Sequence, residues 1–188
     1  MAADNFWTTS AARDPKRAFR FTVEFTDLGI LWYAKTVTKP KITFGEAEHN
    51  FLNHRFYYPG RAEWDPVTLT LVDPVSPDAA SVLLNKISET GYRLPASAAG
   101  LTSTATGGAL STPSKNSSVE AFGDLLIRQI DQDGAAVETW TLNNAWIKDL
   151  SFGDLDYSSD ELLELTMTVR YDWASFTGTN GVELFRPE

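Results

Sequence analysis

The two histidines are the first residues to consider for catalysis, because imidazole is the usual general base near neutral pH. His49 and His54 are the only histidines among 188 residues. A nucleophilic triad needs a serine beside a histidine that a carboxylate orients, and no Gly-x-Ser-x-Gly turn accompanies either histidine. Their spacing within an aromatic segment predicts opposite faces of one strand. We therefore expect ordinary, partly exposed side chains and no catalytic residues. The chain has no cysteine, which excludes disulfides, thiolate metal sites and cysteine nucleophiles.

Two acidic segments carry the oxygen ligands that calcium prefers. Residues 131–134 read Asp-Gln-Asp-Gly, which is shorter than an EF-hand loop and lacks its distal glutamate. Residues 154–160 have acids at alternate positions, but Ser159 stands where such a loop needs glycine and Leu165 where it needs glutamate. Both segments are interpreted as hairpin turns with solvated carboxylates. We expect no metal and no other cofactor.

The net charge is unfavourable for binding nucleic acid or anionic lipid. Sixteen lysines and arginines stand against 25 aspartates and glutamates, which gives −9 at pH 7, and such a molecule repels phosphate. The one basic cluster contains Arg13, Lys16, Arg17 and Arg20. In so acidic a chain these cations favour pairing with acids on a neighbouring surface over binding nucleic acid. Residues 1–20 lack the apolar run of a signal peptide, which predicts assembly in the cytoplasm.

Alternation of apolar and polar residues predicts a mainly β protein. Phe19, Phe21, Val23 and Phe25, for example, alternate with polar residues as in a half-buried strand. The length and composition fit one domain over residues 1–188, an antiparallel β-barrel or sandwich. Strands are expected over residues 18–26, 30–38, 67–73, 122–130, 137–142, 145–150 and 163–173, and residues 42–58 are expected to form two strands or a long hairpin ending at the Pro59-Gly60 turn signal.

One α-helix is predicted over about residues 77–90. Ser76 is a suitable N-cap, Gly91 is a suitable residue after the C-terminus, and apolar residues between them recur at helical spacing. Residues 92–118 are rich in alanine, serine, threonine and glycine, so we expect a low-complexity loop or insertion there, either a mobile loop or a local lid. Residues 174–188 are expected to form an extended C-terminal tail.

Several segments, taken in order, carry a resemblance to a known family. They are Lys16 to Phe25, Pro59 to Leu71 with the helix that follows, Trp146 to Leu150, Leu155 to Ser159, and Glu164 to Trp173 with its Arg-Tyr-Asp-Trp ending. In this order they resemble the tail tube proteins of contractile-tailed bacteriophages. The resemblance covers most of the chain between Lys16 and Trp173, and residues 92–118 look like a family-variable insertion.

The resemblance implies a structural protein of the virion, assembled in the host bacterial cytoplasm, and no enzyme. Subunits of this family form hexameric rings whose sheets join edge to edge into a ring-wide β-barrel, and the rings stack into a hollow tube. The implied partners are further copies of the chain, a tail sheath protein, baseplate and tail terminator proteins, and a tape measure protein in the lumen. DNA would be transient cargo, which fits an acidic protein with low affinity for phosphate. Related tubes occur in type VI secretion, pyocins and extracellular contractile injection systems.

Two sets of residues follow as candidates for assembly and for the lumen. The aromatic segment 51–64 fills the core or makes contacts between subunits and stacked rings, and its candidate contact residues are Phe51, Arg55, Tyr57, Tyr58, Arg61 and Trp64. Alternation along the strands suggests a lumen-facing set of Glu24, Glu164, Thr166 and Thr168.

Two other functions compete with the tube subunit. The first is an adaptor of the same fold, such as a baseplate component or a tube terminator, and the second is a tube subunit of another contractile injection system. An enzyme of the β-sandwich hydrolase type would need a clustered acid pair, for which Asp154, Asp156 and Asp160 are the candidates.

Reversing one charge in the aromatic segment tests its expected role. Arg61→Glu should leave the monomer folded, because a surface substitution rarely costs more than about 0.5 kcal/mol, while impairing polymerisation. Circular dichroism checks the fold and electron microscopy checks the polymers. Unchanged polymers would count against a contact role for Arg61.

Overall fold

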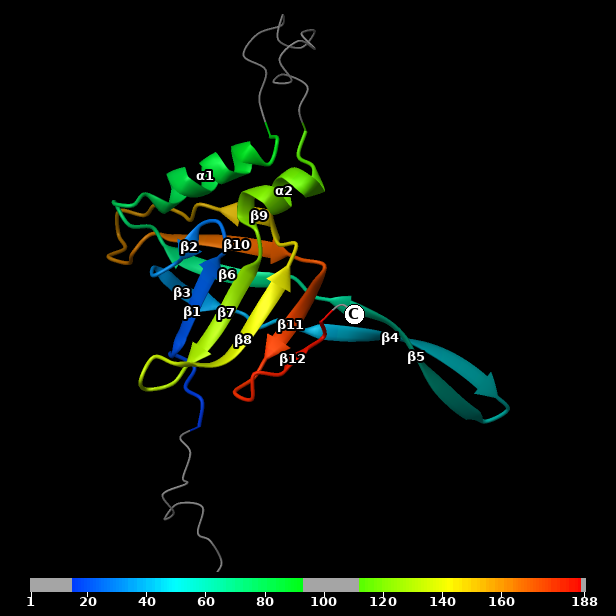
Figure 1. Ribbon diagram of the computed structural model, residues 1–188. Helices are drawn as coiled ribbons and strands as arrows, with labels where there is room; N and C mark the ends of the chain where they lie inside the picture. The colour runs from blue at the N-terminus through cyan, green and yellow to red at the C-terminus, as the bar shows by residue number, and fades with distance from the viewer. Residues whose placement is uncertain (1–14, 93–111, 187–188) are drawn as a thin grey trace, which may run out of the picture.

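The computed structural model describes residues 15–92 and 112–186, which form twelve strands and two helices (Figure 1). One sheet contains β1 (Phe21–Phe25), β2 (Gly29–Ile30), β7 (Leu125–Ile130), β8 (Ala136–Asn143), β11 (Trp173–Thr177) and β12 (Glu183–Leu184). A second contains β3 (Ala34–Val37), β6 (Val67–Val72), β9 (Trp146–Ser151) and β10 (Glu164–Arg170), and a third is the hairpin of β4 (Ile42–Phe51) and β5 (His54–Trp64). The strand orders are β12-β11-β8-β7-β1-β2 and β3-β6-β10-β9. The described strands pair antiparallel, so the expected mainly β, antiparallel architecture is confirmed.

The core lies between the six-stranded and four-stranded sheets, whose strands run across one another (Figure 1). Val23 and Phe25 of β1 are fully buried, as are Leu69 of β6 and Met167 of β10. Alternate residues of β1, β6, β7 and β10 are therefore inside, as their period-two pattern predicts. The two sheets turn their polar faces away from this shared core.

The predicted helix is α1 (Ala79–Glu89), and it lies with α2 (Lys115–Phe122) over one end of the sheets (Figure 1). Asp78, rather than Ser76, is the N-cap, and its carboxylate accepts a hydrogen bond of 3.0 Å from the Ser81 amide. Phe122 packs on Phe25 of the core, with 5.7 Å between the ring centroids.

The expectation of a single helix was wrong, because α2 begins inside residues 92–118. Ser114 caps it, with its hydroxyl accepting from the Ser117 amide at 3.1 Å. This helix is polar for most of its length, so its periodicity is weak, and burial of Ala121 and Phe122 against the core stabilises it instead. Residues 93–111 of the expected loop lie outside the described residues.

Two predicted strands are each divided by a change of sheet. Residues 163–173 form β10 in the four-stranded sheet and the start of β11 in the six-stranded sheet. The corner is Tyr171-Asp172, where the Asp172 amide donates to the Asn143 carbonyl at 3.1 Å. Residues 30–38 are likewise split between β2 and β3. The inward series changes phase at both corners: Ala174, and not Trp173, lies opposite the buried Leu142, and Tyr33 and Ala34 are consecutive inward residues. The apolar pattern of the sequence runs on to Trp173 and therefore does not reveal the break. Part of residues 174–188 forms β11 and β12.

Truncation of a core residue tests this packing. Leu69→Ala should lower the free energy of unfolding by about 2–5 kcal/mol, because it removes a fully buried side chain and leaves a cavity. Urea denaturation followed by tryptophan fluorescence measures the loss. Val75→Ala is the control, since Val75 is fully exposed and its truncation should cost less than about 0.5 kcal/mol. Equal effects of the two substitutions would contradict the core assignment.

Candidate assembly interface

The hairpin of β4 and β5 projects from the body of the molecule (Figure 1). Every residue from 43 to 63 is exposed, including large apolar side chains such as Phe51, which is 62% exposed. A two-stranded hairpin on its own is at best marginally stable in water. This element has the exposure expected of a contact with another molecule.

The distal half of the hairpin has one aromatic and one polar side. Ala47 pairs with Tyr58, and residues directly opposite each other point to the same side of a sheet. The same register pairs the two histidines with phenylalanines, and the aromatic face is therefore Ala47, His49, Phe51, His54, Phe56 and Tyr58. The other side carries Glu46, Glu48, Asn50, Arg55 and Tyr57. A ribbon with one aromatic side can pack that side against an apolar surface.

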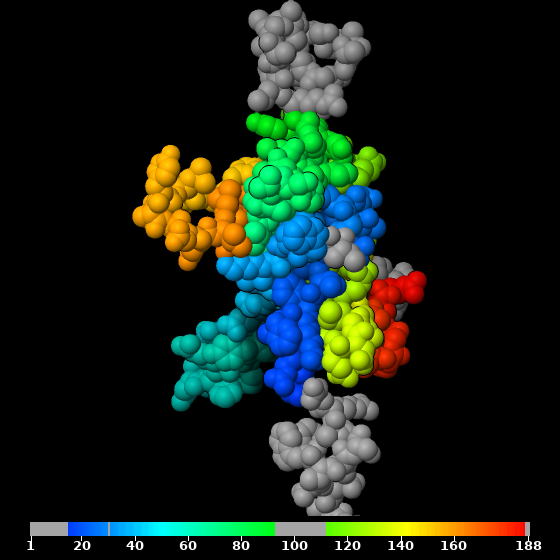
Figure 2. Space-filling model, turned by 90° about the vertical axis from the view of Figure 1, so that its left-hand side faces the viewer, coloured from blue at the N-terminus to red at the C-terminus, as the bar shows by residue number. Residues whose placement is uncertain are grey.

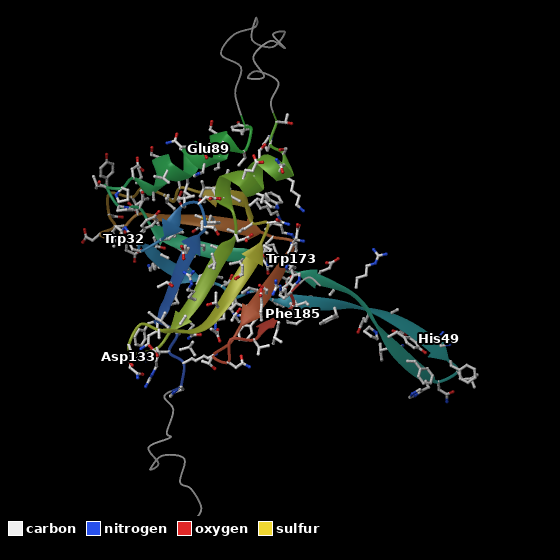
Figure 3. The ribbon with its side chains drawn as sticks, in the orientation of Figure 1. Trp32, His49, Glu89, Asp133, Trp173 and Phe185 are labelled. Carbon is white, nitrogen blue, oxygen red and sulfur yellow. The ribbon has the colours of Figure 1, made fainter. Side chains whose placement is uncertain are left out.

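The two histidines lie on different strands but on the same face. The expectation that they occupy opposite faces of one strand was wrong, because the turn at Leu52 and Asn53 lies between them. The His54 ring meets the Phe56 ring edge-on at 4.8 Å. Figure 3 shows His49 near the far end of the hairpin, away from any acid–base partner in the body. This arrangement has no feature of a catalytic pair.

The Pro59-Gly60 pair lies inside β5, so the predicted turn there was wrong. Both strands of a two-stranded ribbon are edges, and an edge tolerates proline because one side of each strand needs no N–H donor. The register shift puts an extra residue in β5, where Gly60 and Arg61 lie opposite Gly45, and a Cβ atom on Gly60 would lie only 3.0 Å from the Gly45 carbonyl carbon and oxygen. The glycine therefore permits a close backbone approach rather than a reversal of the chain.

Trp64 anchors the base of the hairpin. Its ring lies 6.1 Å from the ring of Tyr171 and 6.0 Å from that of Phe185, which Figure 3 shows beside the hairpin base. Burial, with a smaller contribution from the charge of Asp65, raises the pKa of Tyr171 to about 12. Lys41 pairs with Asp65 at 2.9 Å at the same end. The base is therefore fixed while the distal part is free to make contacts.

The other five predicted contact residues lie along the projecting part, on both of its sides. Phe51 and Tyr58 are on the aromatic face, Arg55 and Tyr57 are on the polar side, and Arg61 lies at the register shift opposite Gly45. Arg55 lies 3.6 Å from Glu48 across the strands. The hairpin thus brings these residues together on one element, and Trp64 stands apart from them at the base.

The predicted lumen residues lie on two different sheets. Glu164, Thr166 and Thr168 share the polar face of β10, whereas Glu24 lies on the polar face of β1. Glu164 pairs with Lys35, and Glu24 pairs with Arg128. Because the two polar faces point away from one core, the structure brings three of these residues together and separates Glu24 from them.

A groove of about 880 Å³ lies between β1, β3 and β7, at the end of the core opposite the helices. Phe21, Val37 and Ile127 contribute apolar side chains to its lining. The charged side chains of the lining are Lys16, Lys35, Lys39, Arg128 and Glu138. The groove is therefore apolar inside, with more cations than anions around it.

Glu138 is the buried carboxylate of the groove lining, and it joins two of the lysines there. It is 6% exposed and pairs with both Lys16 and Lys39. Burial alone would raise its pKa, but the hydrogen bonds from the two lysines outweigh burial, and the pKa of Glu138 lies below its usual value. Lys39 also donates to the Gln129 amide oxygen at 2.7 Å, and Gln129 donates to the Arg17 carbonyl at 3.0 Å. This network ties the start of the described chain to both sheets.

Sequence reasoning missed this network, although the alternation contains its signal. Gln129 continues the inward series of Leu125 and Ile127, and Glu138 continues that of Leu142 and Trp140. A polar residue at an inward position of a strand indicates a buried polar contact. Arg13 of the predicted basic cluster lies outside the described residues.

The acidic segment 154–160 lies in the loop between β9 and β10, whose residues 152–162 are all exposed. Figure 2 shows this loop projecting from the body on the left-hand side. The Asp156 carboxylate accepts from the Ser158 amide at 2.9 Å and from its hydroxyl at 2.8 Å, and these hydrogen bonds lower the pKa of Asp156. Leu155 and Tyr157 extend into solvent.

The first acidic segment forms the predicted hairpin turn between β7 and β8. The Asp131 amide donates to the Ala135 carbonyl at 2.9 Å, and Gly134 has a φ of 83°. Within residues 15–92 and 112–186, no three histidine, aspartate or glutamate side chains are grouped as a metal ion would require. None of the helices in this part of the chain is long and apolar enough to cross a membrane.

No family model and no curated protein matches the sequence. Solved structures do match the fold. A chain in the cryo-EM structure of the anti-feeding prophage (AFP) tube terminating cap is 18% identical, with a TM-score of 0.64, and the match covers 95% of this chain and all of that one. The fold is that of contractile injection system proteins.

Two further matches come from PVC, an extracellular contractile injection system. One chain, from its sheath-tube complex in the extended state, is 17% identical with a TM-score of 0.63, over 92% of this chain and 100% of that chain. Another chain, from the PVC sheath/tube terminator in the extended state, is 17% identical with a TM-score of 0.64, and the match covers 89% of this chain and 100% of that chain. The similarity in fold thus extends over almost the whole chain.

Removing the buried carboxylate tests the groove network. Glu138→Gln should lower the free energy of unfolding at pH 7 by ~1–2 kcal/mol, a value reduced because both lysines are half exposed. The folded-state pKa of Glu138 is lowered, so its contribution is present above its unfolded pKa, near 4.5, and is lost as pH falls through the folded value. Urea denaturation at pH 7 and at pH 3 measures both effects.

The difference between Glu138→Gln and wild type should therefore shrink at pH 3. Glu183→Gln is the matched control, because Glu183 is exposed on β12 and its substitution should have little effect at either pH. A constant difference between wild type and Glu138→Gln at both pH values would contradict the role of the carboxylate charge.

Proposed function

We propose that the chain is a structural subunit of the inner tail tube of a contractile phage tail, with no enzymatic role. Subunits form hexameric rings, the rings stack, and the lumen conducts DNA during ejection. The observation that carries the proposal is the projecting hairpin, whose aromatic face is exposed from Ala47 to Tyr58. The fold similarity to chains of contractile injection systems supports the same class of assembly.

The hairpin favours repeated assembly of one chain. An exposed aromatic patch on an element that the body does not cover marks an interaction site. A contact between an arm and a different surface of another copy is heterologous, and such contacts generate closed rings or open filaments. A stack of rings has both features, since each ring is closed and the stack of rings is an open filament.

The free strand edges identify the sheet best suited to ring closure. The six-stranded sheet ends in β2 and β12, each of two residues, which offer little backbone to a neighbour. The four-stranded sheet ends in β3, with four residues, and β9, with six. In the proposed ring, β3 of one subunit lies beside β9 of the next, and the four-stranded sheet lines the lumen.

The polar face of that sheet suits a conduit for DNA. Thr70 faces Thr166 and Thr68 faces Thr168 across β6 and β10. These hydroxyl groups carry no charge and give phosphate no electrostatic attraction. Arg170, at the end of β10, adds one cation to the same face. Glu164, at the start of β10, is already paired with Lys35. In this arrangement Glu24 lies away from the lumen.

The proposed partners follow from this role. Besides its own copies, the tube contacts a tail sheath protein outside, baseplate and tail terminator proteins at its ends, and a tape measure protein within. The virion is the proposed location, after assembly in the bacterial cytoplasm. Structures of a tube terminating cap and of a sheath/tube terminator share the fold, which keeps two alternatives open. These are a terminator or baseplate adaptor, and the tube of another contractile injection system.

Self-assembly of the purified protein separates a tube subunit from an adaptor. A tube subunit should form rings or long polymers of uniform diameter in negative-stain images, whereas an adaptor should remain small. The triple variant Phe51→Ser/Phe56→Ser/Tyr58→Ser should stay monomeric and folded, because it removes the aromatic face but no core residue.

Val75→Ser is the matched control for that variant, since Val75 is fully exposed but lies before α1, outside the hairpin. It should polymerise like the wild type. Polymers of normal length from the triple variant would contradict a role for the hairpin, and a wild-type protein that never assembles would contradict the tube.

A further inference from the structure

The acidic loop of residues 152–163 and the groove between the sheets are complementary to each other. We propose that this loop of one copy docks into the groove of a second copy, in the assembly proposed above and therefore dependent on it. In the docked state the acids of the loop pair with the cations of the groove, and Leu155 and Tyr157 pack on its apolar lining.

The groove carries an excess of positive charge in a strongly acidic protein. Four cations line it against one carboxylate. Lys16 and Lys39 share Glu138, whereas Lys35 pairs with Glu164 and Arg128 with Glu24, so four cations meet three carboxylates and one positive charge is left over. Arg17 and Arg20 lie in the same N-terminal segment as Lys16. An anionic segment is thus the occupant that this charge favours, because a charge left partly unpaired in a groove attracts its opposite.

The loop carries the opposite charge and no cation. Its acids are Asp154, Asp156, Asp160 and Glu161. Leu155 and Tyr157 stand between or beside these acids, and Leu162 follows them; all three are exposed. Loops of about this length without secondary structure of their own are uncommon in compact domains and are usually either functional or disordered. Acids alternating with unpacked apolar residues match a groove that has an apolar lining and cations around it.

The size of the groove also fits the loop. A volume of about 880 Å³ lies in the range of pockets that enclose a drug-sized ligand, which is comparable to several side chains. Phe19, at 75% exposure, is a further lining residue that contact would cover. In the single chain, residues 152–162 are all exposed and the loop extends outward (Figure 2). The groove of the same chain therefore leaves the loop unburied, and a second copy is the occupant.

The absence of cysteine makes a disulfide test specific. The double variant Leu155→Cys/Phe19→Cys places one thiol on the loop and one in the groove. Under mild oxidation, assembled protein should give a ladder of disulfide-linked oligomers on a non-reducing gel, and each single variant should give at most dimers. Leu155→Cys/Val75→Cys is the control, because Val75 lies by the helices, at the other end from the groove, and it should give no ladder.

The outcomes separate this inference from the proposed function. Polymers that form without a ladder overturn the loop–groove contact and leave the tube standing. A disulfide within one chain, seen as a monomer of altered mobility, also overturns the contact between copies. A wild-type protein that never assembles overturns the tube, and this contact with it.

Charge exchange gives a second measurement, which does not depend on thiol geometry. Asp154→Lys/Asp156→Lys should raise the critical concentration for polymerisation about tenfold or more, as expected for the loss of roughly 1.4 kcal/mol at each contact. Lys35→Glu should act in the same direction. The chain with all three substitutions should have a critical concentration close to that of the wild type, because each contact then pairs a lysine of the loop with a glutamate of the groove. A combined variant no better than Asp154→Lys/Asp156→Lys would overturn the proposal, as would wild-type behaviour of that loop variant.

Discussion

The aromatic face of the hairpin is left uncovered by the rest of the described chain, residues 15–92 and 112–186. Every residue from 43 to 63 is exposed, and a lone two-stranded ribbon has too little burial to be independently stable. Its base is nevertheless held firmly, by the packing of Trp64 on Tyr171 and Phe185 and by the Lys41–Asp65 pair. A fixed base with an uncovered arm is the arrangement of a subunit that completes its burial in an assembly.

The rest of the molecule holds the surfaces that such an assembly needs at fixed positions. Two crossed sheets bury one core, from Val23 in β1 to Met167 in β10, and the helices close one end of it. At the other end the core gives way to a groove, where Glu138 binds two lysines. Because the hairpin base and the groove are held by the same two sheets, their positions relative to each other are set within the single chain, which would lower the entropic cost of association.

Local pattern predicted the strands better than their corners. The alternation from Phe21 to Phe25 and the helix near residues 77–90 required only neighbours in sequence, whereas Phe19, predicted on the same face, lies before β1 and is exposed. The break at Tyr171-Asp172 could not be predicted, since the apolar alternation of the sequence runs on to Trp173, whereas in β11 Ala174 and not Trp173 lies opposite the buried Leu142. The Pro59-Gly60 signal misled because both strands of the hairpin are edges. The sequence predicted the contact residues as one aromatic segment, but their division between two sides of the hairpin depends on the position of the turn. The groove could not be predicted, because its lining comes from strands that are distant in sequence.

The most direct test of the central claim is hydrogen exchange of the hairpin before and after assembly. In the monomer, the amides of residues 43–63 that face outward from the ribbon should exchange quickly, since nothing covers them, while those of β7 and β10 are protected. In the assembled state the hairpin amides should become protected toward the level of the core strands, and the triple serine variant should keep fast exchange at the same concentration. Polymers in which the hairpin exchanges as fast as in the monomer would contradict the claim that its aromatic face makes the contact between copies.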